Sequence, residues 1–159
     1  MLDAGCGNGE NALHVASLEL PVLGFDVAAT ALAMARARAE ERGLAAEFIE
    51  ADALRLGSLG RRFQTVVLDC GLIHTFDGEE RPRYVAGLAS VTEHDGTLHV
   101  LCFSDEGAGT GPHPVSRKEL TTAFNPDAGW DVVAIEPDRI QTLIHDGGAP
   151  AWLATIRWR

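Results

Sequence analysis

The sequence predicts an α/β fold in which a mostly parallel, seven-stranded sheet ends in an antiparallel strand, all within one domain of residues 1–159. Five short apolar segments alternate with helical segments as far as residue 124, a pattern typical of parallel sheets. The last two apolar segments, 130–135 and 151–158, have no helix between them, so they should pair as a hairpin. A chain of this length can bury a substantial core.

The composition limits the classes of function. Of the residues, 46% are hydrophobic and 23% are charged, as in ordinary globular proteins. The 13 basic and 23 acidic residues give a formal charge of -10, which disfavours nucleic acid as a partner because phosphate binding needs a basic surface. No apolar run approaches the roughly 20 residues that span a membrane, and no signal peptide is evident. We therefore expect a cytoplasmic protein with no membrane partner.

The three cysteines, Cys6, Cys70 and Cys102, lie far apart and show no C-x-x-C spacing. Their odd number and wide separation indicate free thiols in a reducing compartment rather than a disulfide framework or a zinc site. The histidines are equally scattered, so we expect no metal site. A serine hydrolase is disfavoured because the chain has no Gly-x-Ser-x-Gly sequence.

The first element is a strand that begins at Met1 and ends in a turn with Gly5, Gly7 and Gly9. A helix should follow from Asn11 to about Glu19. Glycine lets the backbone turn sharply and lets a ligand approach without meeting a Cβ atom. The free N–H groups at a helix N-terminus favour an electron-rich ligand. This stretch is therefore the first candidate for a ligand site.

Two kinds of cofactor compete for the glycine turn. Residues 7–12 formally satisfy the G-x-G-x-x-G/A pattern of dinucleotide-binding folds, whereas Glu10 stands where a third glycine would follow Gly5 and Gly7. Asp3 favours the other class, a cofactor that carries a positive charge. A carboxylate would repel a pyrophosphate but suits a ligand that carries an ammonium or a sulfonium group. An NAD(P)-binding domain stays as the less favoured alternative.

The second and third strands are each followed by an acid. The strand at 21–25 is closed by Asp26, about 20 residues after the turn, where an acid can accept hydrogen bonds from both ribose hydroxyls. The alternative is that Asp26 only caps the alanine-rich helix at 28–42, which Gly43 ends. The strand at 46–50 precedes Asp52, which could equally be an ordinary turn acid.

The second half of the chain continues the alternation. The apolar run within 63–69 predicts a central strand buried on both faces, and the residues after it should face the ligand crevice. A helix at 82–93, a turn at Asp95 and Gly96, and a strand at 97–103 follow. The loop 104–115 is rich in glycine and proline and is long enough to be functional. Ser116 opens a short helix to Phe124, with Glu119 at capping-box spacing.

The segment Asp3-x-Gly5-x-Gly7-x-Gly9 resembles the first motif of the class I S-adenosylmethionine-dependent methyltransferases, and the expected order of elements matches their layout over nearly the whole chain. The resemblance implies a Rossmann-like three-layer sandwich and S-adenosylmethionine as the cofactor, with S-adenosylhomocysteine as the product. In the family, an acid after the third strand lies near the adenine amino group. The implied cofactor residues are Asp3, Gly5, Cys6, Gly7, Gly9, Asp26, Val27, Asp52, Ala53, Asp69 and Cys70.

The resemblance also implies a side for the methyl acceptor. Residues 69–76 and the Gly111-Pro112-His113-Pro114 loop look most similar to the branch near the bacterial thiopurine and tellurite-resistance methyltransferases, which act on thiols, halides and metalloid oxyanions. We expect His74, Phe103 and His113 to face a small-molecule acceptor. For a phenol, His74 is the candidate general base, since its ordinary pKa is near 6.5, and a neutral pocket wall is the equal alternative.

One departure from the family concerns the N-terminus. Members carry helical segments before the first strand that cover the cofactor, whereas this sequence starts with the strand itself. We therefore expect a shortened chain without this helical cap, an exposed apolar patch beside the glycine turn, and weakened cofactor binding. An inactive nucleoside-binding remnant is the second functional hypothesis. The oligomeric state is left open, with a homodimer as one option.

Overall fold

The structure is a computed structural model that describes residues 1–106, 113–141 and 145–159, except for the side chains of residues 65–70. Its sheet has seven strands in the order β3-β2-β1-β4-β5-β7-β6. β7 runs antiparallel to its neighbours β5 and β6, and the other pairs are parallel. The predicted mostly parallel sheet with an antiparallel final strand is confirmed. The strands are β1 (Leu2–Ala4), β2 (Leu23–Asp26), β3 (Glu47–Glu50), β4 (Phe63–Cys70), β5 (Thr92–Phe103), β6 (Trp130–Ile140) and β7 (Ala149–Trp158).

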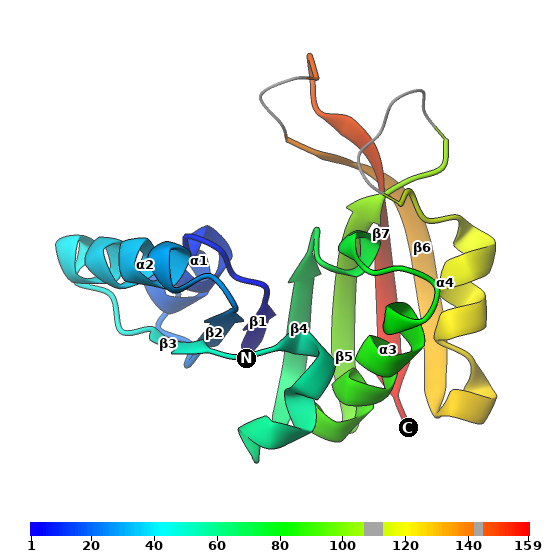
Figure 1. Cartoon of the computed structure of the whole chain (residues 1–159), viewed down its shortest axis with the longest axis horizontal. Coiled ribbons are helices and arrows are strands. Elements are labelled where there is room, and N and C mark those ends of the chain that lie inside the picture. Colours follow the sequence, from blue (N-terminus) through cyan, green and yellow to red (C-terminus); the bar gives the residue numbers. More distant parts are fainter. Residues whose placement is uncertain (107–112, 142–144) are drawn as a thin grey trace.

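Helices cover the two faces of this sheet. Figure 1 shows α1 (Glu10–Ser17) and α2 (Ala29–Arg42) beside β1–β3, and α3 (Glu80–Val91) and α4 (Arg117–Ala123) over β4–β6. Alternate residues of a strand point to opposite faces. Accordingly Leu23 and Phe25 belong to the core under α3 and α4, whereas Val22 and Phe48 pack with α1 and α2. The result is the three-layer α/β sandwich.

The helices form where apolar spacing and end signals agree. In α1 the buried residues recur at helical spacing, and in α2 Leu32, Ala35 and Ala39 form one buried stripe. α2 ends at Gly43, which adopts the left-handed conformation at φ 63°. The capping box predicted at the start of α4 is present, with Ser116 and Glu119 as partners. None of the helices in the described segments is long and apolar enough to cross a bilayer.

Several boundaries differ from the sequence prediction for local reasons. α3 starts at Glu80 rather than residue 82, because the Asp77 carboxylate accepts the N–H groups of Glu79 and Glu80 and Pro82 is tolerated in a first turn. The turn expected at Asp95 lies inside β5, where Asp95 has φ 62° and the register with β4 shifts as in a β-bulge. A 3₁₀ helix, η1 (Ala53–Leu59), was not expected from the sequence.

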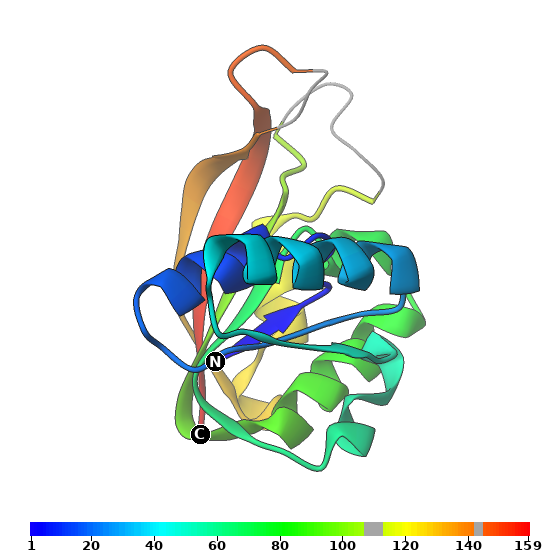
Figure 2. The ribbon, with the colours of Figure 1, turned by 90° about the vertical axis from the view of Figure 1, so that its left-hand side faces the viewer.

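The terminal hairpin is longer than predicted. β6 continues to Ile140 and β7 begins at Ala149, so the two strands extend as an arm beyond the carboxyl end of β5 (Figures 1 and 2). Pro137 lies within β6, which is an edge strand of the sheet and therefore tolerates proline. Ser104 donates its backbone N–H to the carbonyl oxygen of Pro150 at 3.0 Å, so the arm is bonded to the start of the loop after β5.

Candidate active site

The glycine turn joins β1 to α1 at the carboxyl edge of the sheet. Gly5, Gly7 and Gly9 have φ values of 64°, 52° and 84°, all in the left-handed region that favours glycine. The turn is tied to β2 because Cys6 donates its N–H to the carbonyl oxygen of Phe25 at 2.9 Å. A Cβ atom at Gly7 would meet nothing within 4 Å, so the backbone is open to a ligand at this residue.

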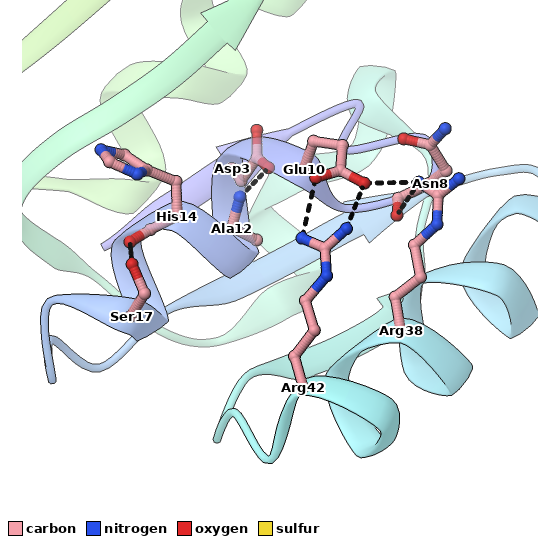
Figure 3. A network of polar contacts seen from close by, with 8 residues as sticks. All are labelled: Asp3, Asn8, Glu10, Ala12, His14, Ser17, Arg38 and Arg42. Atoms are coloured by element: carbon pink, nitrogen blue, oxygen red, sulfur yellow. Dashed lines mark hydrogen bonds and ion pairs between the residues drawn. The ribbon is translucent and has the colours of Figure 1, made fainter.

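Asp3 is buried and joins β1 to the start of α1. It is 1% exposed, and its Oδ2 accepts the N–H of Ala12 at 3.0 Å (Figure 3). Gly9, the N-cap residue of α1, supplies no side-chain cap. The Asp3 carboxylate therefore caps α1 from the strand that precedes it, and its negative charge interacts favourably with the positive end of the helix dipole. The sequence indicates a ligand role for Asp3 but gives no sign of this structural one.

Asp26 links the glycine turn to the end of β2. Its Oδ2 accepts the N–H of Gly7 at 2.9 Å, and its Oδ1 accepts the N–H of Ala28 at 2.8 Å. The second bond closes an Asx turn just before α2, whose N-cap residue Ala28 has no side-chain cap, so Asp26 does not cap that helix. The first bond holds the glycine turn beside β2. Val27, the next residue, is 66% exposed at this edge. The geometry therefore places the Asp26 carboxylate beside the glycine turn, and its contact with a ribose stays a prediction.

The remaining predicted cofactor residues lie along the same edge. Asp52 Oδ1 accepts the N–H of Leu54 at 2.8 Å and caps η1, as expected for a turn acid, while Ala53 is buried. Contact of these two residues with adenine stays a prediction. Asp69 is paired with Ala4 in the β1–β4 register. The side chains of Asp69 and Cys70 lie outside the described residues.

The pKa of Cys6 reflects the electrostatic environment of the turn. Burial, followed by the negative charges of Asp3 and Asp26, raises the pKa of the Cys6 thiol to about 12. Cys6 is therefore a protonated thiol at neutral pH rather than a nucleophile. The negative charges of Asp3 and Asp26 favour a cation over an anion at this turn. A ligand with an ammonium or sulfonium group fits this turn better than a pyrophosphate does.

A polar network fixes the two helices behind the turn. Glu10, the first residue of α1, accepts hydrogen bonds from Arg38 at 2.8 Å and from Arg42 at 2.9 and 3.0 Å (Figure 3). Arg38 also donates to the carbonyl oxygen of Asn8 at 3.4 Å. The contacts show that α2 holds the start of α1 and the turn before it.

On the acceptor side, His74 and Phe103 meet where β4 and β5 end. Their ring centroids are 4.4 Å apart, and His74 Nδ1 accepts the backbone N–H of Phe103 at 3.4 Å. His74 is 5% exposed, whereas His113 is exposed. Gly111 and Pro112 of the predicted loop lie outside the described residues. The structure thus brings two of the three predicted acceptor-side residues into contact.

The environment of His74 keeps it neutral. Burial, together with the nearby charges of Arg81 and His113, lowers the pKa of His74 from its ordinary value of 6.5 to about 4. In the neutral ring the nitrogen that accepts the Phe103 N–H carries no proton, so the proton is on Nε2. At pH 7 this histidine is therefore arranged as a hydrogen-bond donor at Nε2 and not as a proton acceptor.

This environment predicts a pH dependence of folding. Because the folded-state pKa lies below the unfolded value, the unfolded chain takes up the proton first as pH falls. Stability should decrease from about pH 6.5 to about pH 4 and then level off, with His74 accounting for about 2–3 kcal/mol at pH 4.5. Urea unfolding of wild type and His74→Gln at pH 7 and pH 4.5 measures this contribution. An equal loss in both proteins, with His94→Gln as the exposed control, would contradict it.

Taken together, the site fits a nucleoside that carries a positive charge. An open glycine backbone, an acid at the end of β2 and a negative field at the turn all point to the same edge of the sheet. Within residues 1–106, 113–141 and 145–159, no group of His, Cys, Asp or Glu side chains could hold a metal ion. The arrangement suits a cationic cofactor at the turn, on the same edge of the sheet as the contact between His74 and Phe103.

Several known proteins are similar to this chain in both sequence and fold. The family model described as "Methyltransferase domain" matches residues 1–96. The 2-heptyl-1-hydroxyquinolin-4(1H)-one methyltransferase of Mycobacteroides abscessus is 34% identical over 157 residues, which cover 94% of this chain and 67% of that protein. A structure solved in work on the conversion of a disulfide bond into a thioacetal group during echinomycin biosynthesis is 33% identical, with a TM-score of 0.85 over 99% of this chain and 74% of that one.

A more distant structure shares the fold. The magnesium protoporphyrin IX methyltransferase of Synechocystis with bound S-adenosylmethionine has 20% identity and a TM-score of 0.73 over 99% of this chain and 69% of that one, which shows the common fold. The family model covers more than half of the chain, and the Mycobacteroides abscessus relative exceeds 30% identity over nearly all of it. The chain therefore belongs to the methyltransferase-domain family and is a class I S-adenosylmethionine-dependent methyltransferase.

Proposed function

We propose that this enzyme methylates a small molecule whose nucleophilic atom is already ionised near neutral pH. Thiolates and the oxyanions of acidic phenols or N-hydroxy heteroarenes are of this kind, and halides and metalloid oxyanions carry the same charge. The observation behind the proposal is that the His74 ring is neutral and already engaged at Nδ1. With its Nδ1 bonded to the Phe103 N–H and its pKa near 4, it is a poor acceptor for a substrate proton at pH 7.

The similarity to the Mycobacteroides abscessus protein supports the oxygen branch of this proposal. That protein is a methyltransferase of 2-heptyl-1-hydroxyquinolin-4(1H)-one, whose name describes a hydroxyl group on a ring nitrogen. An aromatic acceptor of that type would suit the pocket wall formed by the His74 and Phe103 rings. Membership in the thiopurine and tellurite-resistance branch stays a prediction, and it would favour thiolates or metalloid oxyanions instead.

We assign the chain's residues to positioning rather than to acid–base chemistry. Bound S-adenosylmethionine supplies an electrophilic methyl group, and the reaction is an in-line displacement that depends mainly on alignment and exclusion of water. Gly7 and Asp26 would hold the ribose and the turn, and Asp3 would keep the turn rigid. The His74 and Phe103 rings would form one wall for the acceptor, with the His74 Nε2–H available to hold an anionic oxygen.

The proposal is tested by the pH dependence of turnover with a graded series of acceptors. Aryl thiols, phenols and N-hydroxy heteroarenes of different acidity are assayed from about pH 5 to about pH 9. The half-maximal pH of kcat/KM should follow the pKa of each acceptor, because only the ionised form reacts. In His74→Gln, in which the amide oxygen can still accept the Phe103 N–H, kcat with an acidic acceptor should stay within about tenfold of wild type.

A different outcome identifies an enzyme base. If every acceptor shows the same half-maximal pH, and His74→Gln lowers kcat by about 100-fold or more, His74 is a general base and the proposal is wrong. His94→Gln is the matched control, since this exposed histidine lies at the start of β5, away from the carboxyl edge of the sheet. S-Adenosylhomocysteine binding should be retained in both variants, which separates loss of chemistry from loss of cofactor.

A further inference from the structure

A cavity lies between α3 and α4, on the sheet face opposite α1 and α2. It is a groove of about 920 Å³, within the range of small-molecule sites. Its floor and sides are mostly apolar, with Val85 and Ala89 from α3, Ala123 from α4 and Trp130 at the start of β6. None of the residues predicted to contact the cofactor or the acceptor lines this groove. The groove is therefore a candidate for a separate ligand.

The rim of the groove carries a local positive charge. Arg81, Lys118 and Glu119 lie along it. Glu119 is already engaged, since it accepts hydrogen bonds from the N–H and hydroxyl of Ser116 and pairs with Arg81 at 3.2 Å. Lys118 is exposed and forms no ion pair within the described residues. The groove thus combines apolar walls with an exposed ammonium group at its rim, in a chain whose net charge is -10.

From these observations we propose that the α3–α4 groove binds a small amphipathic acid, with its apolar body along Val85, Ala89 and Trp130 and its carboxylate at Lys118. The apolar walls supply affinity through burial of a hydrocarbon or aryl body. The ammonium group selects an acidic head group over a neutral one. The proposal goes beyond the proposed function and does not depend on the identity of the methyl acceptor.

Calorimetric titration of the full chain with decanoate tests this proposal, and decanol serves as the uncharged probe of similar length. Decanoate should bind saturably at one site and more tightly than decanol. Lys118→Gln should weaken decanoate binding by about tenfold and leave decanol binding unchanged, because only the acid uses the ammonium group. Ala86→Leu should weaken both probes, since Ala86 lies on the groove wall and is exposed, so a larger side chain fills the groove without entering the core.

Two matched controls separate the groove from the rest of the surface. Arg83→Gln removes a charge from an exposed α3 position outside the groove, and Ala37→Leu enlarges an exposed alanine on α2. Both should bind decanoate as wild type does, and all variants should still bind S-adenosylhomocysteine. The proposal is overturned if decanoate does not bind saturably, if Ala86→Leu binds it normally, or if Lys118→Gln affects both probes equally. Because no methyl acceptor is present, none of these results depends on the proposed reaction.

Discussion

Replacement of Gly9 by alanine is expected to cost the folded state about 3–5 kcal/mol, a large part of the stability of a typical domain. A Cβ atom at this position would lie 2.8 Å from the Cβ of Ala35 and 2.9 Å from Cζ of Phe48. Phe48 is 6% exposed and Ala35 is fully buried in the core of α1 and α2, so neither can move aside easily. The φ of 84° adds backbone strain for any residue with a side chain.

Gly7 offers the matched comparison within the same turn. It has a φ of 52°, but a Cβ atom there would meet nothing within 4 Å. Gly7→Ala should therefore cost only the strain of the left-handed conformation, about 1–2 kcal/mol. Urea unfolding of both variants measures the difference. An equal loss of stability in the two variants would show that the packing of Gly9 against Ala35 and Phe48 is not what requires glycine there.

Loss of the Asp26 carboxylate is expected to reduce the affinity for S-adenosylhomocysteine by about 100-fold or more. Hydrogen bonds to charged groups contribute about 1.5–3 kcal/mol each, and two of them to a ribose would account for this factor. In Asp26→Ala the N–H groups of Gly7 and Ala28 also lose their acceptor, so the turn is less well held before any ligand binds. Both effects lower the affinity for S-adenosylhomocysteine.

Titration calorimetry on folded protein, checked by circular dichroism, measures this loss. Asp26→Asn keeps one oxygen acceptor and should bind with intermediate affinity. Asp127→Ala, a change at an exposed acid in the 3₁₀ helix η3 (Pro126–Ala128), is the control and should bind as wild type does. An affinity of Asp26→Ala within about threefold of wild type would remove Asp26 from the ribose site.

Features that are coded over a few neighbouring residues could be predicted from the sequence. The left-handed glycines of the first turn, the end of α2 at Gly43 and the capping box at Ser116 all depend on backbone and side-chain preferences within one turn. The alternation of apolar segments and the lack of a helix before β7 were enough for the fold class. The 3₁₀ helix η1 was missed because its residues, Ala53–Leu59, carry no helical periodicity.

Other properties arise only when separate segments pack together, and the tertiary structure alone decided them. Asp3 caps α1 because β1 places its carboxylate at Ala12, and the state of His74 is set by the backbone of Phe103, 29 residues away. The bulge in β5 and the groove between α3 and α4 likewise depend on neighbours from other elements. The sequence by itself determined the fold class through the spacing of its apolar segments, and the cofactor class through the motif from Asp3 to Gly9 and its resemblance to a known family. Burial, tautomer and cavity shape depend on long-range packing, which no local pattern encodes.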